Sequence, residues 1–480
     1  MNFGTVLTWI EIQLLVQAVV IVRILLREDR DPAVRTAWIL VVLSVPILGA
    51  VVYLTFGEAR IARLARRRMS AAIEGLPKTP PGSAAGPRWT PEVTLAAAVA
   101  RAEAVNGLLA TAGNRVELLP DAPPAIDRLI ADIDEAKRHV SLCFYIWLPD
   151  ETGARIADAV VRAARRGVAC RCLADGLGAR HYIASPHWDR MGAAGARLAV
   201  AFPFRFASLR ALRARIDIRN HRKIAIIDGE VAHTGSQNLA DPEFRIKAAY
   251  APWVDIMVRV TGPSVWQMQY LFLCDWVTHS GEGEAAELLD HPAPAPAGDG
   301  GVAVIGSGPE LQPNAVTDIF QAVVAAARES VEITTPYYVP DQALHQAIVA
   351  AATRGVRVRM ILPARNDSFI VAHASRSFYK SLLSGGVEIF EYQGGFLHAK
   401  ALVADGRLAV VGSANMDRRS FDLNYENCLL TGDAGLAAAL EVRRTAWLAR
   451  CRAVGLDEVR GWSRVRRIQN NLFVLFAPLL

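Results

Sequence analysis

The sequence predicts an α/β protein built from two tandem domains that form a pseudo-two-fold core, with a transmembrane helical hairpin in front of them. Three observations carry this prediction: two apolar stretches at the N-terminus, a repeat that covers most of the remaining chain, and a strand–helix–strand pattern inside each repeat. The 480 residues are 52% hydrophobic and 21% charged, which excludes a disordered chain and a small disulfide scaffold. At about 150 residues per domain, the length suffices for about three units.

The two apolar stretches are long enough to cross a membrane. Thr5 to Leu26 would cover about 33 Å as a helix, enough for a hydrocarbon core of about 30 Å, although four polar or charged residues interrupt it. Thr36 to Phe56 carries no charge and is the stronger predicted span, because a membrane helix tolerates Pro46 and Gly49 better than a soluble helix does. The alternative is a buried apolar hairpin in a soluble protein.

Arginines around the hairpin predict its orientation. The segment after the hairpin carries more cations than the loop inside it, and the more basic flank of a membrane span stays in the cytoplasm. We therefore expect a multi-pass membrane protein whose large domains are cytoplasmic. The arginines are Arg60, Arg63, Arg66, Arg67 and Arg68 after the hairpin, against Arg27, Arg30 and Arg35 in the loop.

A repeat relates the two large blocks of the chain. The recurring set is His221, Lys223, Asp228, Gly229, Gly235, Ser236 and Asn238, which return 177 positions later as His398, Lys400, Asp405, Gly406, Gly412, Ser413 and Asn415. Further upstream, Phe144 to Asp150 corresponds to Pro336 to Asp341. The repeat therefore spans whole domains and not a single loop.

Stretches rich in proline, glycine and small residues separate these blocks. The predicted organisation is a hairpin with a basic segment at 1–69, a linker at 70–92, a first domain at 93–281, a linker at 282–301, and a second domain at 302–480 with an apolar C-terminal tail.

Within each block, an apolar strand, an alanine-rich helix and a second strand follow one another. In the first block these are Val140–Ile146, Ile156–Arg165 and Val168–Leu173, and in the second Val331–Thr334, Leu344–Thr353 and Val356–Leu362. This order predicts an α/β sheet with right-handed crossovers. The histidine and lysine of each motif are two residues apart on a strand, so both point to the same face.

Two histidines and two lysines on such faces suit a phosphodiester. One imidazole can attack phosphorus while the other protonates the leaving oxygen, and the lysines supply the positive field for the phosphoryl oxygens. A single short motif of this kind would more often be a solvated strand face, but its duplication in register favours catalysis. The net charge of +6 also favours anionic partners.

The sequence gives no sign of a metal site or cofactor. The six cysteines include no CxxC pair, and no cluster of carboxylates has a spacing that suits magnesium or calcium. We therefore expect reduced, mostly buried thiols and no cofactor.

Both motifs resemble those of the phospholipase D superfamily, and the surrounding sequence resembles the bacterial cardiolipin synthases over nearly the whole chain. The segments that carry the resemblance are Asn220–Lys223, Thr234–Phe244, Trp253–Asp255, Thr335–Asp341, Gly395–Lys400 and Gly412–Glu426, together with the hairpin. The resemblance implies two tandem phospholipase D-like domains in the bacterial inner membrane. It also implies a phosphatidyltransferase that converts two phosphatidylglycerol molecules to cardiolipin and glycerol.

Carried over position by position, the resemblance makes His221 the nucleophile and His398 the general acid and base. Asp255 and Glu426 are the candidates for the carboxylates that orient the two histidines. Asp228 and Asp405 complete the motifs but fit the turn after each strand better than the chemistry. The groups expected to hold the phosphoryl oxygens are Lys223, Lys400, Ser236, Ser413, Asn238 and Asn415. One departure from the family is Ala179, where serine is expected.

Three other functions remain open at this stage. A lipid hydrolase would use the same site with water as the acceptor. A nuclease or other phosphodiesterase of the superfamily is disfavoured by the hairpin and the modest charge, so no nucleic-acid partner is expected. A catalytically silent membrane scaffold is disfavoured because both motifs are intact.

Two basic segments outside the motifs could contact lipid. Arg205, Arg210, Arg213, Arg215 and Arg219 precede the first motif and could gather anionic headgroups, or form a solvated loop. Arg464, Arg466 and Arg467 precede an apolar tail, Leu472 to Leu480, which either dips into the bilayer surface or packs on the protein. The sequence does not predict an oligomeric state.

Overall fold

The computed structural model describes residues 3–27, 32–57, 70, 73–81, 86–203, 218–281, 283–309 and 314–475. Of the described residues, 3–57 and Ile218 belong to one compact unit, and those from 70 to 203 and from 219 onward belong to a second. The arginines at 60–68, on which the predicted orientation rests, lie outside the described residues, as do Arg30 and the arginines at 205–215.

The N-terminal unit contains α1 (Phe3–Leu25), α2 (Pro32–Ser44), α3 (Pro46–Val52) and a π-helical turn, η1 (Tyr53–Gly57). Among the described residues, one helix is long and apolar enough to cross a membrane, over Thr8–Leu25. The structure divides the predicted span 36–56 between α2, α3 and η1, and its crossing of a membrane stays a prediction. Pro46 begins a new helix there, because proline cannot continue the hydrogen-bonding pattern of the helix before it.

The helices of this unit pack on one another through a small apolar cluster. Val20 and Ile24 of α1 lie with Trp38, Val42 and Tyr53. The side-chain amide of Gln17 is also buried and donates to the carbonyl of Val42 at 2.9 Å. This bond satisfies a polar group that would otherwise be costly in an apolar helix.

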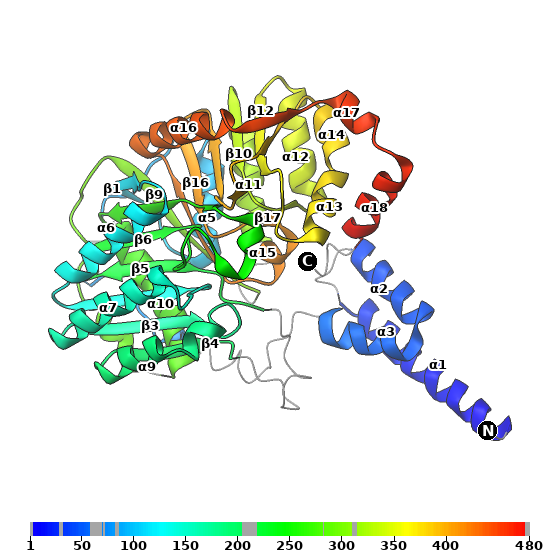
Figure 1. Cartoon of the computed structure of the whole chain (residues 1–480), viewed down its shortest axis with the longest axis horizontal. Coiled ribbons are helices and arrows are strands. Elements are labelled where there is room, and N and C mark those ends of the chain that lie inside the picture. Colours follow the sequence, from blue (N-terminus) through cyan, green and yellow to red (C-terminus); the bar gives the residue numbers. More distant parts are fainter. Residues whose placement is uncertain are drawn as a thin grey trace. The chain divides into compact units, whose positions relative to one another are not determined.

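The second unit is organised around one fifteen-stranded sheet (Figure 1). Its strands, in spatial order, are β19 (Cys451–Val454), β13 (Glu388–Tyr392), β12 (Arg357–Pro363), β10 (Ser330–Thr334), β15 (Ala401–Ala404), β16 (Leu408–Gly412), β18 (Glu426–Thr431), β9 (Gly300–Ser307), β1 (Thr111–Leu118), β8 (Met257–Thr261), β6 (Val231–Gly235), β5 (Lys223–Ile227), β2 (His139–Phe144), β3 (Ala169–Asp175) and β4 (Arg197–Ala201). From the antiparallel β1–β9 pair outward, both halves repeat the same strand arrangement, and β19 is an addition to the second half. The internal repeat thus becomes a pseudo-two-fold sheet.

Each half contains the predicted parallel strand–helix–strand unit. In the first half, α7 (Glu151–Arg165) connects β2 to β3, and in the second, α12 (Gln342–Thr353) connects β10 to β12. Both helices begin with an aspartate N-cap, Asp150 and Asp341, whose carboxylate accepts a hydrogen bond from a backbone amide of the first turn.

Helices cover both faces of the sheet. The further helices on one face are α5 (Ala96–Asn106), α6 (Ala122–Glu135), α8 (Arg180–Ile183), α9 (Pro186–Ala193), α11 (Ala315–Ala326) and α14 (Tyr379–Ser384). The opposite face packs against α10 (Ser264–Ser280) and α16 (Ala434–Leu448). Although the sequence predicts α5 within the first domain, it packs against α11 of the second half.

Short elements complete the unit. They are β7 (Trp253–Val254) paired with β14 (Phe396–Leu397), β11 (Tyr338–Val339) paired with β17 (Met416–Asp417), the 3-10 helices η2 (Arg245–Tyr250) and η3 (Gly283–Leu289), and the helices α13 (Phe369–Ser377), α15 (Arg418–Asp422), α17 (Leu456–Arg460) and α18 (Arg464–Val474).

Candidate active site

The two His-x-Lys segments lie at the start of equivalent strands: Lys223 is the first residue of β5, and Lys400 directly precedes β15. Each segment is bonded to the other half of the repeat. The amide of His221 donates to the carbonyl of Tyr425 at 2.9 Å, and the amide of His398 donates to the carbonyl of Val254 at 2.8 Å. These carbonyls belong to the residues just before Glu426 and Asp255. Each motif is thus fixed to the segment that carries a carboxylate of the opposite repeat.

Each carboxylate also contacts the imidazole ring of the histidine in the opposite repeat. The Nδ1 atom of His221 lies 2.8 Å from Oε2 of Glu426, and Nδ1 of His398 lies 2.7 Å from Oδ1 of Asp255. With Nδ1–H donated to a carboxylate, the neutral ring carries its lone pair on Nε2, which is the atom left for a substrate. Both pairs are buried.

Ser236 and Ser413 hold these carboxylates. The Ser236 hydroxyl donates to Asp255 at 2.6 Å and accepts a hydrogen bond from the amide of Ile256. Ser413 repeats the arrangement, donating to Glu426 and accepting from the amide of Asn427. Their hydroxyl protons are therefore directed to carboxylates, which differs from the phosphate contact that the resemblance implies.

The two lysines occupy equivalent positions. Lys223 Nζ donates to the carbonyl of His221, and Lys400 Nζ donates to that of His398, both at 2.6 Å. Burial lowers the pKa of Lys223 to about 8 and that of Lys400 to about 7, against the opposing effect of the nearby carboxylates. Two cations whose hydration is largely removed are strong ligands for an anion.

The lysines of both motifs act on the pKa of each histidine. Burial lowers the pKa of His221 to about 4, although Glu426 raises it, and the charges of both lysines lower it further. Burial likewise lowers the pKa of His398, opposed by Asp255, and both lysines again act on it. Both imidazoles are therefore neutral at pH 7, and the negative charge of a phosphodiester beside them would raise their pKa.

The carboxylates remain ionised. Burial opposes ionisation of Glu426 and Asp255, but the hydrogen bonds from the paired histidine and serine, with the charge of the nearby lysine, outweigh it and hold each pKa below the ordinary value.

Aromatic rings line the site on both sides. The ring of Tyr145 meets that of His221 edge-on at a centroid distance of 4.8 Å, and Trp253 lies 4.7 Å from His398. Trp253 is in turn stacked on Phe244 at 3.9 Å. These rings restrict the motion of the imidazoles and exclude water.

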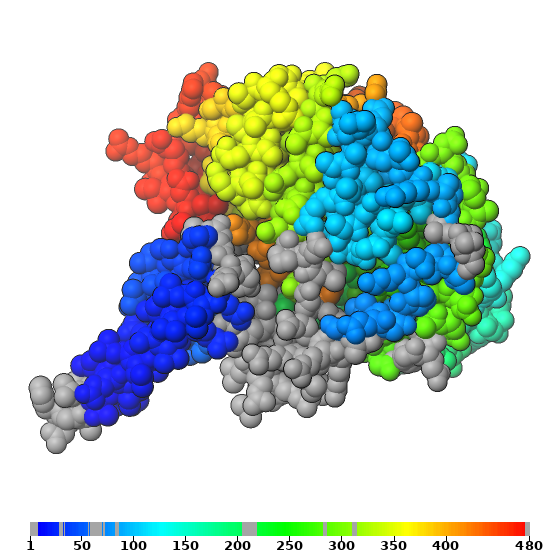
Figure 2. Space-filling model, turned by 180° about the vertical axis from the view of Figure 1, so that it is seen from behind, coloured from blue at the N-terminus to red at the C-terminus, as the bar shows by residue number. Residues whose placement is uncertain are grey.

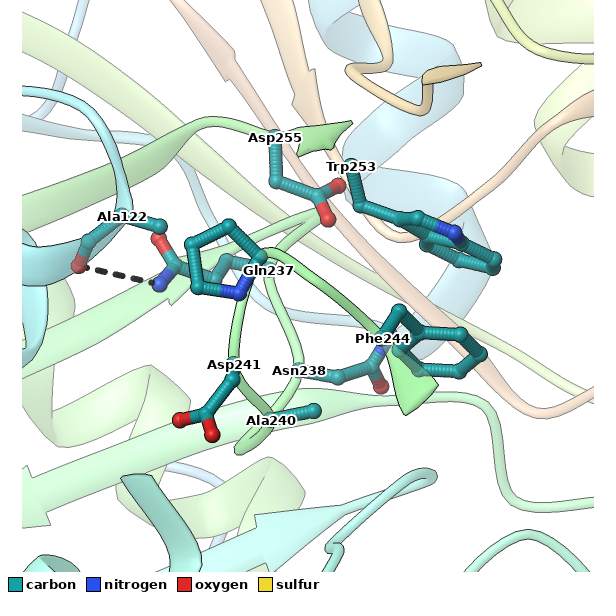
Figure 3. A pocket seen from close by; sticks show the side chains of 9 residues that line it. Ala122, Gln237, Asn238, Ala240, Asp241, Phe244, Trp253 and Asp255 are labelled. Carbon is teal, nitrogen blue, oxygen red and sulfur yellow. Dashed lines mark hydrogen bonds between the residues drawn. The ribbon is translucent and has the colours of Figure 1, made fainter. Parts of the chain in front are cut away.

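Asn238 and Asn415 occupy equivalent turns, and Asn238 borders a small cavity beside Asp255 (Figure 3). The side-chain oxygen of Asn238 accepts a hydrogen bond from the backbone amide of Ile146 at 3.1 Å. The side-chain NH2 group of Asn238 therefore points away from Ile146. The Oδ1 atom of Asn415 is buried and has no hydrogen-bond partner among the described residues. The cavity measures about 10 Å³, enough for one water molecule.

Asp228 and Asp405 do not contact either histidine. Each has a positive φ, 55° and 53°, in the turn after its strand. The Asp228 carboxylate accepts hydrogen bonds from the amides of residues 137–139, and Asp405 from those of residues 328–330. They hold the turn that precedes β2 and β10, at the end of the strand away from the catalytic motif.

A buried network behind the first motif was not found from the sequence. Arg222 forms an ion pair with Asp275 of α10, and its guanidinium also donates to the carbonyls of Glu426 and Ser307. Asn220 donates to the same Asp275 at 2.8 Å. The one available signal was that Asp275 is the only acidic residue in α10. The second motif has Ala399 in place of Arg222.

Two further groups complete the surroundings. Asn424 donates to Glu426 Oε1 at 3.1 Å, a contact that sequence reasoning also missed. Arg219, which was grouped with a basic run that could meet lipid, is instead buried and lies 3.4 Å from Asp175. Asp175 also accepts from the amide of Asn220, so Arg219 supports the loop that carries the first motif.

Comparison with known proteins agrees with this geometry. A family model described as "Cardiolipin synthase, PLD-like domain" matches residues 129–261 and 321–445, and one described as "Phospholipase_D-nuclease N-terminal" matches 15–58. Cardiolipin synthase A of Cronobacter sakazakii is 35% identical over 504 aligned residues, and that of Yersinia pseudotuberculosis is 34% identical over 507, with both chains covered completely in each case. The chain belongs to the cardiolipin synthase family.

The fold predicted for such a cardiolipin synthase, two tandem phospholipase D-like α/β domains, is confirmed. The crystal structure of phosphatidylserine synthase from Haemophilus influenzae Rd KW20 has the same fold, with a TM-score of 0.58 over 86% of this chain and 98% of that one. Its sequence identity is 15%, so this likeness concerns the fold alone. The family difference at Ala179 falls on a buried residue that directly precedes α8.

Proposed function

We propose that the chain is a phosphatidyltransferase that makes cardiolipin and glycerol from two molecules of phosphatidylglycerol. The observation that carries the proposal is the intact two-histidine site, in a chain that matches cardiolipin synthase A along its full length. Each imidazole has its own lysine and its own buried carboxylate, so neither half of the repeat has lost its catalytic groups.

In the first step, Nε2 of His221 attacks the phosphorus of one phosphatidylglycerol. The bond from phosphorus to the oxygen of the headgroup glycerol breaks, and His398, protonated when the anion binds, gives that oxygen its proton. Glycerol leaves, and the phosphatidyl group stays on His221 as a phosphohistidine. Glu426 stabilises the positive charge that develops on His221.

In the second step, His398 removes a proton from a headgroup hydroxyl of the second phosphatidylglycerol. The oxygen attacks phosphorus, the bond to His221 breaks, and cardiolipin is released. Lys223 and Lys400 neutralise the phosphoryl oxygens in both steps. In this proposal Asn238 and Asn415 add neutral donors. We assign Ser236 and Ser413 to the orientation of the carboxylates, since their hydroxyls already donate to them.

The proposal also covers the location of the enzyme in the cell. The long apolar helix α1 supports attachment to the bacterial inner membrane, where the lipid substrates are. A hairpin topology with the catalytic unit in the cytoplasm accords with the arginine-rich sequence at 60–68.

The test is to incubate the detergent-purified full chain with phosphatidylglycerol and a chelator, and to identify the products by mass spectrometry. Cardiolipin and glycerol in equal amounts are expected. Phosphatidic acid without cardiolipin would make the protein a hydrolase, and unchanged lipid would refute both activities.

The variants His221→Ala and His398→Ala are each expected to abolish turnover. His345→Ala is a matched control, because His345 is also a buried histidine of the same unit but bonds to Tyr338 and Ser381 outside the site. Substantial activity in either catalytic variant would contradict the two-histidine mechanism.

A further inference from the structure

The C-terminal helix α18 exposes a continuous apolar face. Val465, Ile468, Leu472 and Leu475 are 64%, 66%, 49% and 71% exposed. At about 100° per residue, they lie within an arc of about 80°. Such a face on the surface of a folded unit marks a contact with another apolar phase or partner.

The opposite face of α18 is anchored, so the direction of the apolar face is fixed. Phe473 and Val474 pack on the cluster that contains Val371 of α13, and Asn470 is buried. At the start of the helix, Arg466 stacks on Trp462 at 4.0 Å. Figure 2 shows this segment, in red, at the surface beside the yellow segment that contains α13.

The beginning of α13 extends the exposed surface. Phe369 is 63% exposed, and its ring lies 5.3 Å from that of Phe473. Ile370 beside it is also exposed. We call these two residues and the four of α18 the α13–α18 patch.

Cations flank the patch. Arg464 and Arg467 are exposed and lie next to one edge of the apolar face of α18. An amphipathic helix with arginines beside an apolar face is typical of segments that lie in the interface of an anionic bilayer. The sequence after Leu475 also remains apolar (FAPLL). Charge and apolarity together favour a lipid surface over a protein partner.

Packed side chains connect the patch with the catalytic site. Tyr337 belongs to the same cluster as Phe473, and its hydroxyl donates to Asp367, two residues before Phe369, at 2.7 Å. The Tyr337 ring is 6.2 Å from that of Phe396, which in turn lies 5.7 Å from the ring of His398.

We propose that the α13–α18 patch is a second membrane contact, which lies in the headgroup layer of an anionic bilayer with its apolar side chains at the acyl boundary. This contact is separate from the α1 span. It holds the packed rings beside His398 close to the lipid surface, and so orients the site toward headgroups.

The test places a fluorescent label in the patch of the full chain, reconstituted in vesicles of phosphatidylglycerol and phosphatidylcholine. Cys451→Ser removes one half-exposed native thiol, and Ile468→Cys carries an environment-sensitive nitrobenzoxadiazole group. The control label is at Val442→Cys on α16, an apolar residue that is equally exposed but outside the patch. Labelling of the Cys451→Ser chain alone gives the background to subtract.

The label at position 468 is expected to emit at shorter wavelength than the label at 442 and to be quenched by lipids with a spin label near the headgroup. Emission like that of the control, without quenching, would overturn the proposal. A blue shift without quenching by lipid would also overturn it, since protein would then cover the patch. Leu472→Cys repeats the measurement if Ile468→Cys does not fold. The readout does not depend on turnover, and cardiolipin formation by the same sample tests the proposed function separately.

Discussion

Replacing Glu426 by glutamine would test whether the second repeat controls the histidine of the first. The Glu426 side chain is fully buried, and its carboxylate accepts hydrogen bonds from His221, Ser413 and Asn424. Glutamine has nearly the same shape but offers one acceptor oxygen and an amide group that donates. At least one of the three donors would then face another donor.

The expected fall in kcat has two causes: glutamine carries no negative charge, and it does not fix the tautomer of His221. Replacing an orienting carboxylate by its amide lowers kcat by about 10⁴ in a serine protease. We expect a loss of about 10³ to 10⁴ in kcat for Glu426→Gln, or about 4 to 5.5 kcal/mol at 1.36 kcal/mol per factor of ten. KM should change little, because Glu426 acts on the histidine and not on the lipid. Glu426→Asp, which keeps the charge, should recover part of the rate.

The assay is the initial rate of cardiolipin formation over a range of phosphatidylglycerol concentrations and pH, with thermal unfolding to confirm the fold. Asp255→Asn is the matched variant on the other histidine and should show a similar loss. A kcat within tenfold of the wild type, in a folded Glu426→Gln protein, would refute the reasoning.

Three further predictions concern charged residues of the second unit. As pH rises through the lowered pKa of Lys400, about 7, and of Lys223, about 8, both lysines lose charge, so kcat/KM should fall above about pH 7. Lys400→Arg should move this decline to higher pH, and an unchanged profile would exclude Lys400 as its cause. Arg222→Met leaves Asp275 buried without its ion-pair partner, so the free energy of unfolding, measured with urea, should fall by about 3 to 5 kcal/mol. The double variant Arg222→Met with Asp275→Leu should recover most of this loss. No recovery would contradict the assignment of the loss to an unpaired Asp275. Asp228→Ala removes the acceptor of three backbone amides, so it should lower the unfolding temperature while kcat stays within about tenfold, because Asp228 does not contact His221.

The sequence was most informative where local spacing decides the outcome. The 177-residue repeat predicted both the two-fold sheet and the equivalent positions of His221 and His398. Pro46 was expected to lie within one apolar helix, but in the structure it begins α3, because proline cannot donate the hydrogen bond that would continue α2.

Other features depend on contacts between distant parts of the chain. In the sequence, Asp255 and Glu426 each follow the motif of their own repeat, yet the structure pairs each with the other histidine. Local spacing cannot give this pairing, since it arises only when β7 lies beside β14 and Asn220 beside Tyr425. Arg219 was misjudged for a related reason: a run of arginines suggests a solvated surface, and its partner Asp175 lies 44 positions away.

The crossed pairing makes the two halves dependent on one another. His221 without Glu426 would be a buried imidazole beside two lysines, with no anion to hold its tautomer or to stabilise its charged form. The same holds for His398 without Asp255. Each repeat therefore supplies a histidine that it cannot activate and a carboxylate that it does not use. Because the β1–β9 pair joins the halves into one sheet, the proposed mechanism needs the fold twice: to bring both histidines to one phosphodiester and to pair each with its carboxylate.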